Sequence, residues 1–232
     1  MITLAIHQPN YLPWLGYFHK ICHCDCFVLL DDVPFQQGNA ASLTSRAWIA
    51  GPNGPFRITV PVKHSGIQLP VCETMIADDH RWKKKHLRAL EHSYAKAPYF
   101  KEVYTLLESI LAKEEQSLSA MNTALISGIC EWLEITSPLV LSSSLGLKEY
   151  QRNDRIIAIC RELGAATYLS GEGARKYQNE SLFLEAGITL RYMDFNHPLY
   201  NRAGQKFFPG LSIADALFYC GKEVKPLISC IQ

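Results

Sequence analysis

The sequence predicts an α/β protein with a mainly parallel sheet, flanking helices and one inserted helical segment. Short apolar runs typical of buried strands alternate with stretches that place apolar residues at helical spacing. The first 33 residues have the size and order of a strand–helix–strand unit. We therefore expect a single domain over residues 1–232, with a helical insertion or cap at about residues 80–135.

The first unit begins with residues 2–6, which are short, apolar and partly β-branched, as in a buried strand. Two prolines set the loop that follows, and the spacing of apolar residues predicts a helix from Trp14 to Cys22. Residues 27–33 form a second apolar run that ends in two acids. This run is typical of a parallel strand buried on both faces.

The middle of the chain changes character twice. Residues 36–54 are rich in Gly, Asn, Ser and Ala and indicate a loop, and residues 56–62 indicate a further strand. Residues 82–134 have helical spacing and predict two or three helices, the first separated from the second by Pro98. Residues 137–141 return to strand chemistry.

The last third continues the alternation. The pattern predicts helices over residues 153–163, 180–185 and 211–220, and strands over residues 166–169 and 188–193. Gly164 and Gly187 follow the first two of these helices at the position where glycine commonly ends a helix.

Composition and charge exclude several classes. The 23 Lys and Arg nearly cancel the 22 Asp and Glu, so the net charge of +1 gives no overall attraction to nucleic acid. No apolar run reaches the roughly 18–20 residues that a membrane span needs. The first residues lack the basic region of a signal peptide, so we expect a cytoplasmic protein.

The eight cysteines are expected to be buried hydrophobic side chains in a reducing compartment. Cys22, Cys24 and Cys26 are separated by single residues, and no second Cys/His cluster follows. Structural zinc ligands are usually spaced two to four residues apart in paired clusters, so we expect no structural zinc and no metal ligand set.

The loop after the first strand is the first candidate site, because ligands of open α/β sheets bind at the carboxyl ends of strands. His7 can act as an acid or base near neutral pH. In the alternative interpretation, Trp14 and Tyr17 belong to the core and the prolines only shape the loop. The other side chains expected to contact a substrate are polar or aromatic: Gln8, Asn10, Tyr11, Trp14 and Tyr17.

Asp31 and Asp32 end the second predicted strand and form the second candidate site. Adjacent strand residues point to opposite faces, so both acids reach one ion only if the strand has already ended. One acid would then bind a sugar hydroxyl or Mg²⁺, and the other would cap a loop. The alternative is that both acids only hold loops.

Ser170 and Gly171 follow a later strand and are small enough to let a ligand approach the backbone. Arg175 adds charge for a phosphate, and Tyr177 adds an aromatic ring. The segment matches neither the P-loop nor the dinucleotide-binding glycine pattern, so an ordinary strand–helix turn is the alternative.

Two further sets carry weaker signals. His86 lies one helical turn beyond Trp82 and could reach a cleft. Ser212 and Asp215 lie near the start of the last predicted helix and are included as substrate contacts. Capping of that helix is the favoured explanation for this pair.

The loop resembles the opening signature of the WbqC-like protein family: His7-Gln8-Pro9-x-Tyr11-Leu12-Pro13-Trp14-x-Gly16-Tyr17-Phe18-x-Lys20. Later blocks are also similar: Leu30-Asp31-Asp32-Val33-x-Phe35, Tyr94-x-x-Ala97-Pro98-Tyr99-Phe100, Leu169-Ser170-Gly171-x-Gly173-Ala174-x-x-Tyr177 and Phe208-Pro209-x-Leu211-Ser212-Ile213-x-Asp215. The chain departs from the family at Pro34, where Gln is usual. It also departs over the stretch from Gln37 to Ser45. In the family this stretch is more polar and contains an Asn-Arg pair, of which Arg46 is the remnant.

The resemblance implies a role in synthesis of bacterial O-antigen or another surface polysaccharide. The leading hypothesis is a transferase that adds an acyl or aminoacyl group to a nucleotide-activated amino sugar. His7 would be the general base, and three cations would meet phosphates: Lys20, Arg46 and Arg175. The expected partner is a sugar nucleotide. The sequence does not identify a cofactor, and Mg²⁺ would be needed if the substrate is a nucleoside triphosphate.

Two other hypotheses stay open. One is a nucleotidyl-transfer or adenylating enzyme that uses ATP, because such enzymes also place a histidine between a first strand and a helix. The other is a non-catalytic protein that binds sugar nucleotides or assembles with a polysaccharide complex. The oligomeric state is not readable from the sequence.

Overall fold

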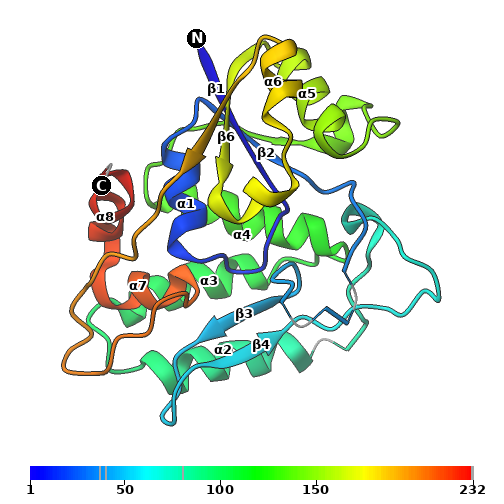
Figure 1. Ribbon diagram of the computed structural model, residues 1–232. Coiled ribbons are helices and arrows are strands. Elements are labelled where there is room, and N and C mark those ends of the chain that lie inside the picture. The colour runs from blue at the N-terminus through cyan, green and yellow to red at the C-terminus, as the bar shows by residue number, and fades with distance from the viewer. Residues whose placement is uncertain (37, 40, 80, 231–232) are drawn as a thin grey trace.

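A computed structural model describes residues 1–36, 38–39, 41–79 and 81–230, and Figure 1 shows its course. Its centre is a five-stranded sheet with the strand order β5-β2-β1-β6-β7. All four strand pairs are parallel, which confirms the predicted fold class. The strands are β1 (Ile2–His7), β2 (Cys26–Leu29), β5 (Leu139–Leu141), β6 (Ala165–Gly171) and β7 (Thr189–Met193).

The strand order reverses between β1 and β6. From β1 the chain passes through helix α1 (Leu15–Cys22) to β2 on one side, whereas β6 pairs with the other side of β1. Ala5 is paired with Leu169, and both strands end two residues later, at His7 and Gly171. Such a reversal leaves a crevice at the carboxyl ends of the two strands, where doubly wound proteins bind ligands.

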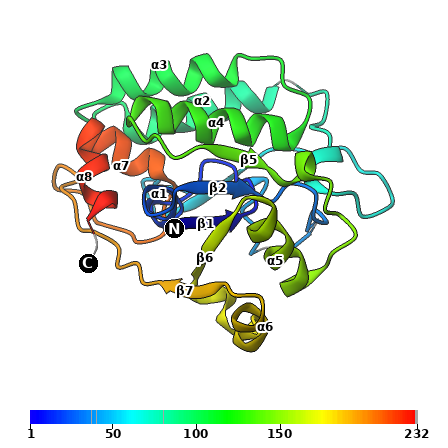
Figure 2. The same cartoon turned by 90° about the horizontal axis from the view of Figure 1, so that it is seen from above.

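Helices cover both faces of the sheet (Figure 2). Helices α1 and α4 (Leu118–Trp132) lie over one face, and α5 (Arg152–Glu162) and α6 (Glu180–Glu185) lie over the other. Side chains alternate along β1, so that Ala5 joins the larger core while Leu4 and Ile6 join the smaller one. Burial on both faces explains why the central strands β1 and β2 are mostly apolar, whereas the edge strand β7 carries exposed Thr189 and Arg191.

The predicted helical segment consists of α2 (Arg81–Tyr94), α3 (Phe100–Leu111) and α4. Pro98 lies between α2 and α3, as expected. Helix α4 buries one apolar side into the larger core through Leu118, Met121 and Leu125. The segment therefore covers one face of the sheet, next to α7 (Ile213–Cys220) and α8 (Val224–Ser229) in Figure 2.

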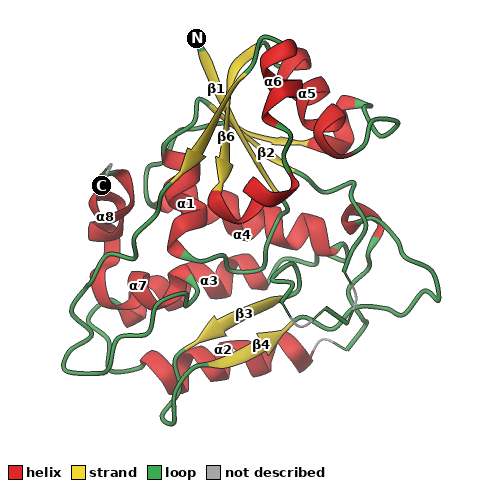
Figure 3. Cartoon of the chain, in the orientation of Figure 1, coloured by secondary structure: helices red, strands yellow, loops and turns green. Residues whose placement is uncertain are grey.

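A second, two-stranded sheet of β3 (Arg46–Ile49) and β4 (Phe56–Thr59) lies beside α2, apart from the parallel sheet (Figure 3). The prediction of a loop over residues 36–54 is therefore wrong for β3. Antiparallel pairing with β4 and burial of Ala47 and Ile49 stabilise a strand that composition alone does not indicate.

Other elements differ from prediction at their ends. Strand β2 ends at Leu29, so Asp31 and Asp32 lie beyond it. Helix α8 has no counterpart among the predicted elements; its Pro226 lies in the first turn, where proline is tolerated. The remaining elements are the 3₁₀-helices η1 (Val71–Glu73), η2 (Ser142–Leu145), η3 (Glu172–Tyr177) and η4 (Gly221–Glu223). Among the described residues, no helix combines the length and apolar character that crossing a bilayer requires.

Candidate functional site

A cavity of about 530 Å³ opens where the strand order reverses. We call it the switch-point cavity. The carboxyl ends of β1, β6 and β7, the first turns of α1 and the helix η3 form its walls. Its volume lies in the usual range for small-molecule sites. Seven of the residues predicted from the sequence line it: His7, Trp14, Tyr17, Lys20, Ser170, Gly171 and Tyr177.

His7 is the last residue of β1, and its imidazole is held in one neutral form. Its Nδ1 lies 3.1 Å from the carbonyl oxygen of Gln8, and because a carbonyl only accepts, Nδ1 carries the proton. The Nε2 lone pair is then free, and no group among the described residues bonds to it. Burial, helped by the charge of Lys20, lowers the pKa of His7 to about 4. His7 is therefore a neutral proton acceptor at pH 7.

Lys20 brings a positive charge to the same cavity from α1. The residue is only 5% exposed, and no carboxylate among the described residues forms an ion pair with it. Burial lowers the pKa of its ammonium group to about 8. A buried cation without a counterion is costly, so an anion that enters the cavity is stabilised there.

Gly171 lets the backbone of β6 approach this ammonium group. A Cβ placed on Gly171 would lie 3.7 Å from Nζ of Lys20. This is an ordinary van der Waals distance, so the ammonium group of Lys20 lies directly beside the backbone at the end of β6.

Aromatic rings form one wall of the cavity. Trp14 lies edge-on to Phe195 with 5.3 Å between ring centroids. A Cβ on Gly16 would come within 2.2 Å of the Trp14 ring, so glycine at this position allows the indole to lie against α1. Tyr17 lies edge-on to His7 and is buried, while Tyr177 is 72% exposed at the rim. These rings can hold the flat face of a base or sugar.

Two carboxylates also line the cavity. Glu172 forms a two-point ion pair with Arg175, whose guanidinium stacks on Tyr192 at 3.8 Å. This pairing explains why Arg175 does not line the cavity, contrary to its predicted contact with phosphate. Asp194 follows β7 and has no ion pair among the described residues. A substrate amine or hydroxyl would be its natural partner.

Tyr11 and His86 contact each other, away from the cavity. The Tyr11 hydroxyl donates to Nδ1 of His86 at 2.9 Å, and Nε2 of His86 donates to the carbonyl of Thr59 at 3.2 Å. Both residues are buried, so they fasten the loop after β1 to α2 and β4. The predicted cleft role of His86 has no support in this geometry.

Gln8 and Asn10 also lie outside the cavity lining. The Gln8 carbonyl accepts from the Tyr17 hydroxyl at 3.1 Å, and its side chain accepts from Thr44 at 3.1 Å. Asn10 is buried. The polar side chains of Gln8 and Asn10 therefore stabilise the shape of the loop. His7, at the end of the strand, is the polar residue here that lines the cavity.

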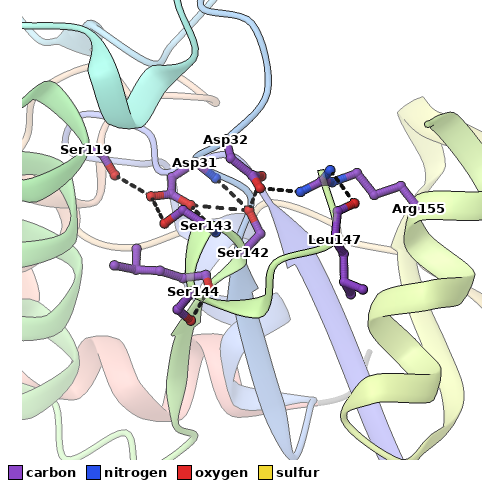
Figure 4. A network of polar contacts seen from close by, with 9 residues as sticks. Asp31, Asp32, Ser119, Ser142, Ser143, Ser144, Leu147 and Arg155 are labelled. Carbon is purple, nitrogen blue, oxygen red and sulfur yellow. Dashed lines mark hydrogen bonds and ion pairs between the residues drawn. The ribbon is translucent and has the colours of Figure 1, made fainter. Parts of the chain in front are cut away.

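Asp31 and Asp32 fasten elements together beyond the end of β2 (Figure 4). Asp31 is 1% exposed and accepts hydrogen bonds from the backbone and hydroxyl of Ser143, both at 2.9 Å, and from Ser142 and Ser119. Asp32 forms an ion pair with Arg155 of α5. Neither acid lines the switch-point cavity, so the geometry matches the alternative in which both hold loops.

Arg46, Ser212 and Asp215 are likewise engaged elsewhere. Arg46 donates to the carbonyl of Asn39 at 2.6 Å. Ser212 caps α7 by accepting from the backbone of Ala214, which confirms the capping interpretation for Ser212 but not for Asp215. Asp215 is fully buried in an ion pair with Arg202 at 2.8 Å. None of the three lines the cavity.

The sequence interpretation missed Glu172, Asp194 and Phe195. Asp194 and Phe195 follow β7, and the rule that directed attention to the ends of β1 and β6 applies equally to this strand. Among the described residues, no group of three or more His, Cys, Asp or Glu is arranged to hold a metal ion.

The fold and cavity define a doubly wound α/β protein with a small-molecule-sized site at its strand-order reversal. The chain matches the WbqC-like protein family over residues 8–225 and belongs to that family. It is 35% identical over 231 residues to the uncharacterized protein Rv1507c of Mycobacterium tuberculosis, and the match covers 96% of each chain. No solved structure matched the chain.

Proposed function

We propose that the protein is a cytoplasmic transferase that adds an acyl or aminoacyl group to the amine of a nucleotide-activated sugar, in surface-polysaccharide synthesis such as that of O-antigen. The observation that carries the proposal is that a neutral histidine, His7, and a buried cation, Lys20, share one cavity. The family resemblance supplies the polysaccharide context.

His7 would act as the base, once phosphates bound at Lys20 offset the positive charge that helps to keep its pKa low. A sugar amine attacks the donor carbonyl, a C–N bond forms, and Nε2 of His7 takes the proton that the nitrogen loses. The bond from the carbonyl carbon to the leaving group then breaks, and the proton passes to that group. A positioned general base contributes roughly 10²–10⁴-fold to such a rate.

Lys20 is suited to bind the phosphates of the sugar nucleotide. Its charge lies beside the Gly171 backbone, and the ring of Trp14 offers a stacking surface in the same cavity. The free carboxylate of Asp194 would hold the amine or a hydroxyl. Arg46 and Arg175 are engaged elsewhere and receive no phosphate role.

An adenylating enzyme is the second candidate function. The start of α1 favours it, because Trp14 provides no side-chain cap there. The Tyr17 N–H is bonded to the Trp14 carbonyl at 3.0 Å, so the N–H of Gly16, which lines the cavity, is the one that a phosphate would meet. Release of pyrophosphate from ATP and Mg²⁺, without an acyl donor, would identify this reaction.

The test is product analysis by mass spectrometry. The pure protein is incubated with UDP-, dTDP- and GDP-linked amino sugars together with acyl or aminoacyl donors. We expect one sugar nucleotide to gain the mass of the acyl group, and His7→Gln to lower the rate 10²–10⁴-fold. Unchanged activity of His7→Gln would remove His7 from the mechanism. A sugar nucleotide that binds without turnover would support a non-catalytic protein.

A further inference from the structure

The carbonyl oxygen of Gln8 accepts two hydrogen bonds, and both donors belong to residues that line the switch-point cavity. One donor is Nδ1 of His7 and the other is the hydroxyl of Tyr17, each at 3.1 Å. A carbonyl oxygen has two lone pairs, so these two donors satisfy it completely. His7 of β1 and Tyr17 of α1 are therefore linked through a single oxygen atom.

The peptide that carries this oxygen has no other polar group. Pro9 follows Gln8, and proline has no N–H through which the peptide could be held from its other side. Within the described part of the chain, the hydrogen bonds to the Gln8 carbonyl come from His7 and Tyr17. The direction of this carbonyl therefore depends on the Tyr17 hydroxyl as well as on the imidazole.

Tyr17 is itself a well-fixed group. It is only 2% exposed, and its ring packs against Phe18 and Phe27 with centroid distances of 5.9 and 5.1 Å. Burial raises the pKa of Tyr17 well above its ordinary value, so its hydroxyl keeps its proton and can donate it to the carbonyl. The ring also lies edge-on to the His7 ring, with 4.9 Å between centroids and 66° between planes. Tyr17 thus restrains His7 in two ways, through the shared carbonyl and through ring contact.

The proton position on His7 decides whether it can act as a base. In a neutral histidine, the hydrogen bond made by one ring nitrogen sets which nitrogen carries the proton. The Gln8 carbonyl keeps the proton on Nδ1 and leaves Nε2 with a lone pair. If the carbonyl turned away, the proton would be free to move to Nε2, which then accepts no proton from a substrate. In the serine proteases, a base histidine held in the wrong tautomer loses about 10⁴-fold in kcat.

We propose that Tyr17 is the positioning residue of His7: its hydroxyl fixes the Gln8 carbonyl, and the carbonyl fixes the imidazole proton on Nδ1. The proposal rests on the proposed function, in which His7 is the base. When Nε2 takes the proton of the sugar amine, Nδ1 keeps its own proton and its bond to the carbonyl. Tyr17 therefore acts through His7 and needs no contact with the substrate.

Tyr17→Phe is the informative variant, because it keeps the ring that contacts His7 and removes only the hydroxyl. One lone pair of the Gln8 carbonyl then lacks its donor, which favours rotation of the peptide toward water. Tyr11→Phe is the matched control. It removes the hydroxyl of another buried tyrosine, in the loop between β1 and α1, whose bond of 2.9 Å goes to His86.

NMR that correlates the ring protons and ring nitrogens of histidine reads the tautomer directly in the full chain. The spectrum of His7→Gln identifies the signals of His7 by their loss. We expect the wild type to carry the proton on Nδ1, and Tyr17→Phe to carry it on Nε2 in part of the molecules. Tyr11→Phe should keep the wild-type spectrum of His7.

Three results of this measurement would overturn the proposal. They are a wild-type His7 with its proton on Nε2, a wild-type pattern in Tyr17→Phe, and an equal disturbance in Tyr11→Phe. The last of these would show that any loosening of the loop disturbs His7.

Kinetics of the transfer reaction give a second readout. Tyr17→Phe should lower kcat about ten-fold, the scale on which the outer partners of a functional histidine act, and should keep the KM for the sugar nucleotide. When it is added to His7→Gln, the same substitution should have no further effect, because its action passes through His7. An equal loss in both backgrounds would show a merely structural role and contradict the proposal.

The two readouts also separate this proposal from the proposed function. If the tautomer of His7 depends on Tyr17 but no acyl transfer takes place, the positioning stands and the proposed function fails. If transfer depends on His7 while Tyr17→Phe keeps the wild-type tautomer and kcat, the proposed function stands and the positioning fails.

Discussion

The ammonium group of Lys20 lies beside the backbone of Gly171, so close that a Cβ on that glycine would be 3.7 Å from Nζ. The two residues come from α1 and from the end of β6, which are about 150 positions apart in the sequence. Their approach places a positive charge, without an ion pair in the described part of the chain, at the point where the strand order reverses. This arrangement favours ligand binding at the expense of stability.

Lys20→Met should therefore stabilise the protein. At pH 7 the wild type keeps a charged group buried whose pKa falls from 10.5 to about 8 on folding, a cost of roughly 3 kcal/mol. Replacement by an apolar side chain of similar length should raise the free energy of unfolding by about 1–3 kcal/mol. Urea denaturation at pH 7 measures this, and a lower stability of Lys20→Met would contradict the account.

The affinity for anionic ligands should depend on pH through the same group. Because the pKa of Lys20 in the free protein is about 8, binding of a nucleoside diphosphate should weaken about ten-fold per pH unit above that value. Calorimetry at pH 7, 8 and 9.5 measures the effect. Lys20→Met should bind weakly at every pH, and a wild-type affinity independent of pH would exclude Lys20 as the phosphate contact.

His86 should make the protein less stable in acid. Burial lowers the pKa of His86 to about 4, so between pH 6.5 and 4 the unfolded chain binds more protons than the folded one. The free energy of unfolding should fall as the pH falls through this range. His86→Gln should make the slope shallower by up to about 1.4 kcal/mol per pH unit. His64→Gln, at an exposed position, is the control and should keep the wild-type slope.

Asp32 should contribute to stability through Arg155. Asp32→Asn leaves the guanidinium of Arg155 buried without its charge partner, which typically costs 3–5 kcal/mol, here about 3 because Asp32 is 11% exposed. The double variant Asp32→Asn with Arg155→Met should recover part of this loss. Chemical denaturation of both variants measures the coupling, and an unchanged stability of Asp32→Asn would show that the ion pair is not structural.

Most of the parallel sheet is predictable because its strands and helices have clear periodicity. Burial on both faces makes β1 and β6 mostly apolar, and glycine marks the end of α5 at Gly164. Strand β3 is not predictable from its composition, because it depends on pairing with β4 rather than on local preference.

Site residues are predictable where their position in a strand or helix determines the direction in which the side chain points. His7 ends a strand at the strand-order reversal, and Lys20 lies one helical turn beyond Gly16 on the same side of α1. Residues in loops are not fixed in this way. Tyr11 turns toward His86, 75 positions away, and Asp31 is bound by serines about 110 positions away, contacts that no local pattern indicates.

The proposed function depends above all on binding of a sugar nucleotide in the switch-point cavity through Lys20. Calorimetric titration of UDP-, dTDP- and GDP-linked amino sugars into the wild type and into Lys20→Met tests it most directly. We expect at least one of these compounds to bind the wild type and to bind Lys20→Met at least ten-fold more weakly, although the variant is the more stable protein. Equal affinity for the two proteins, or no binding of any of these compounds to the folded wild type, would contradict the claim.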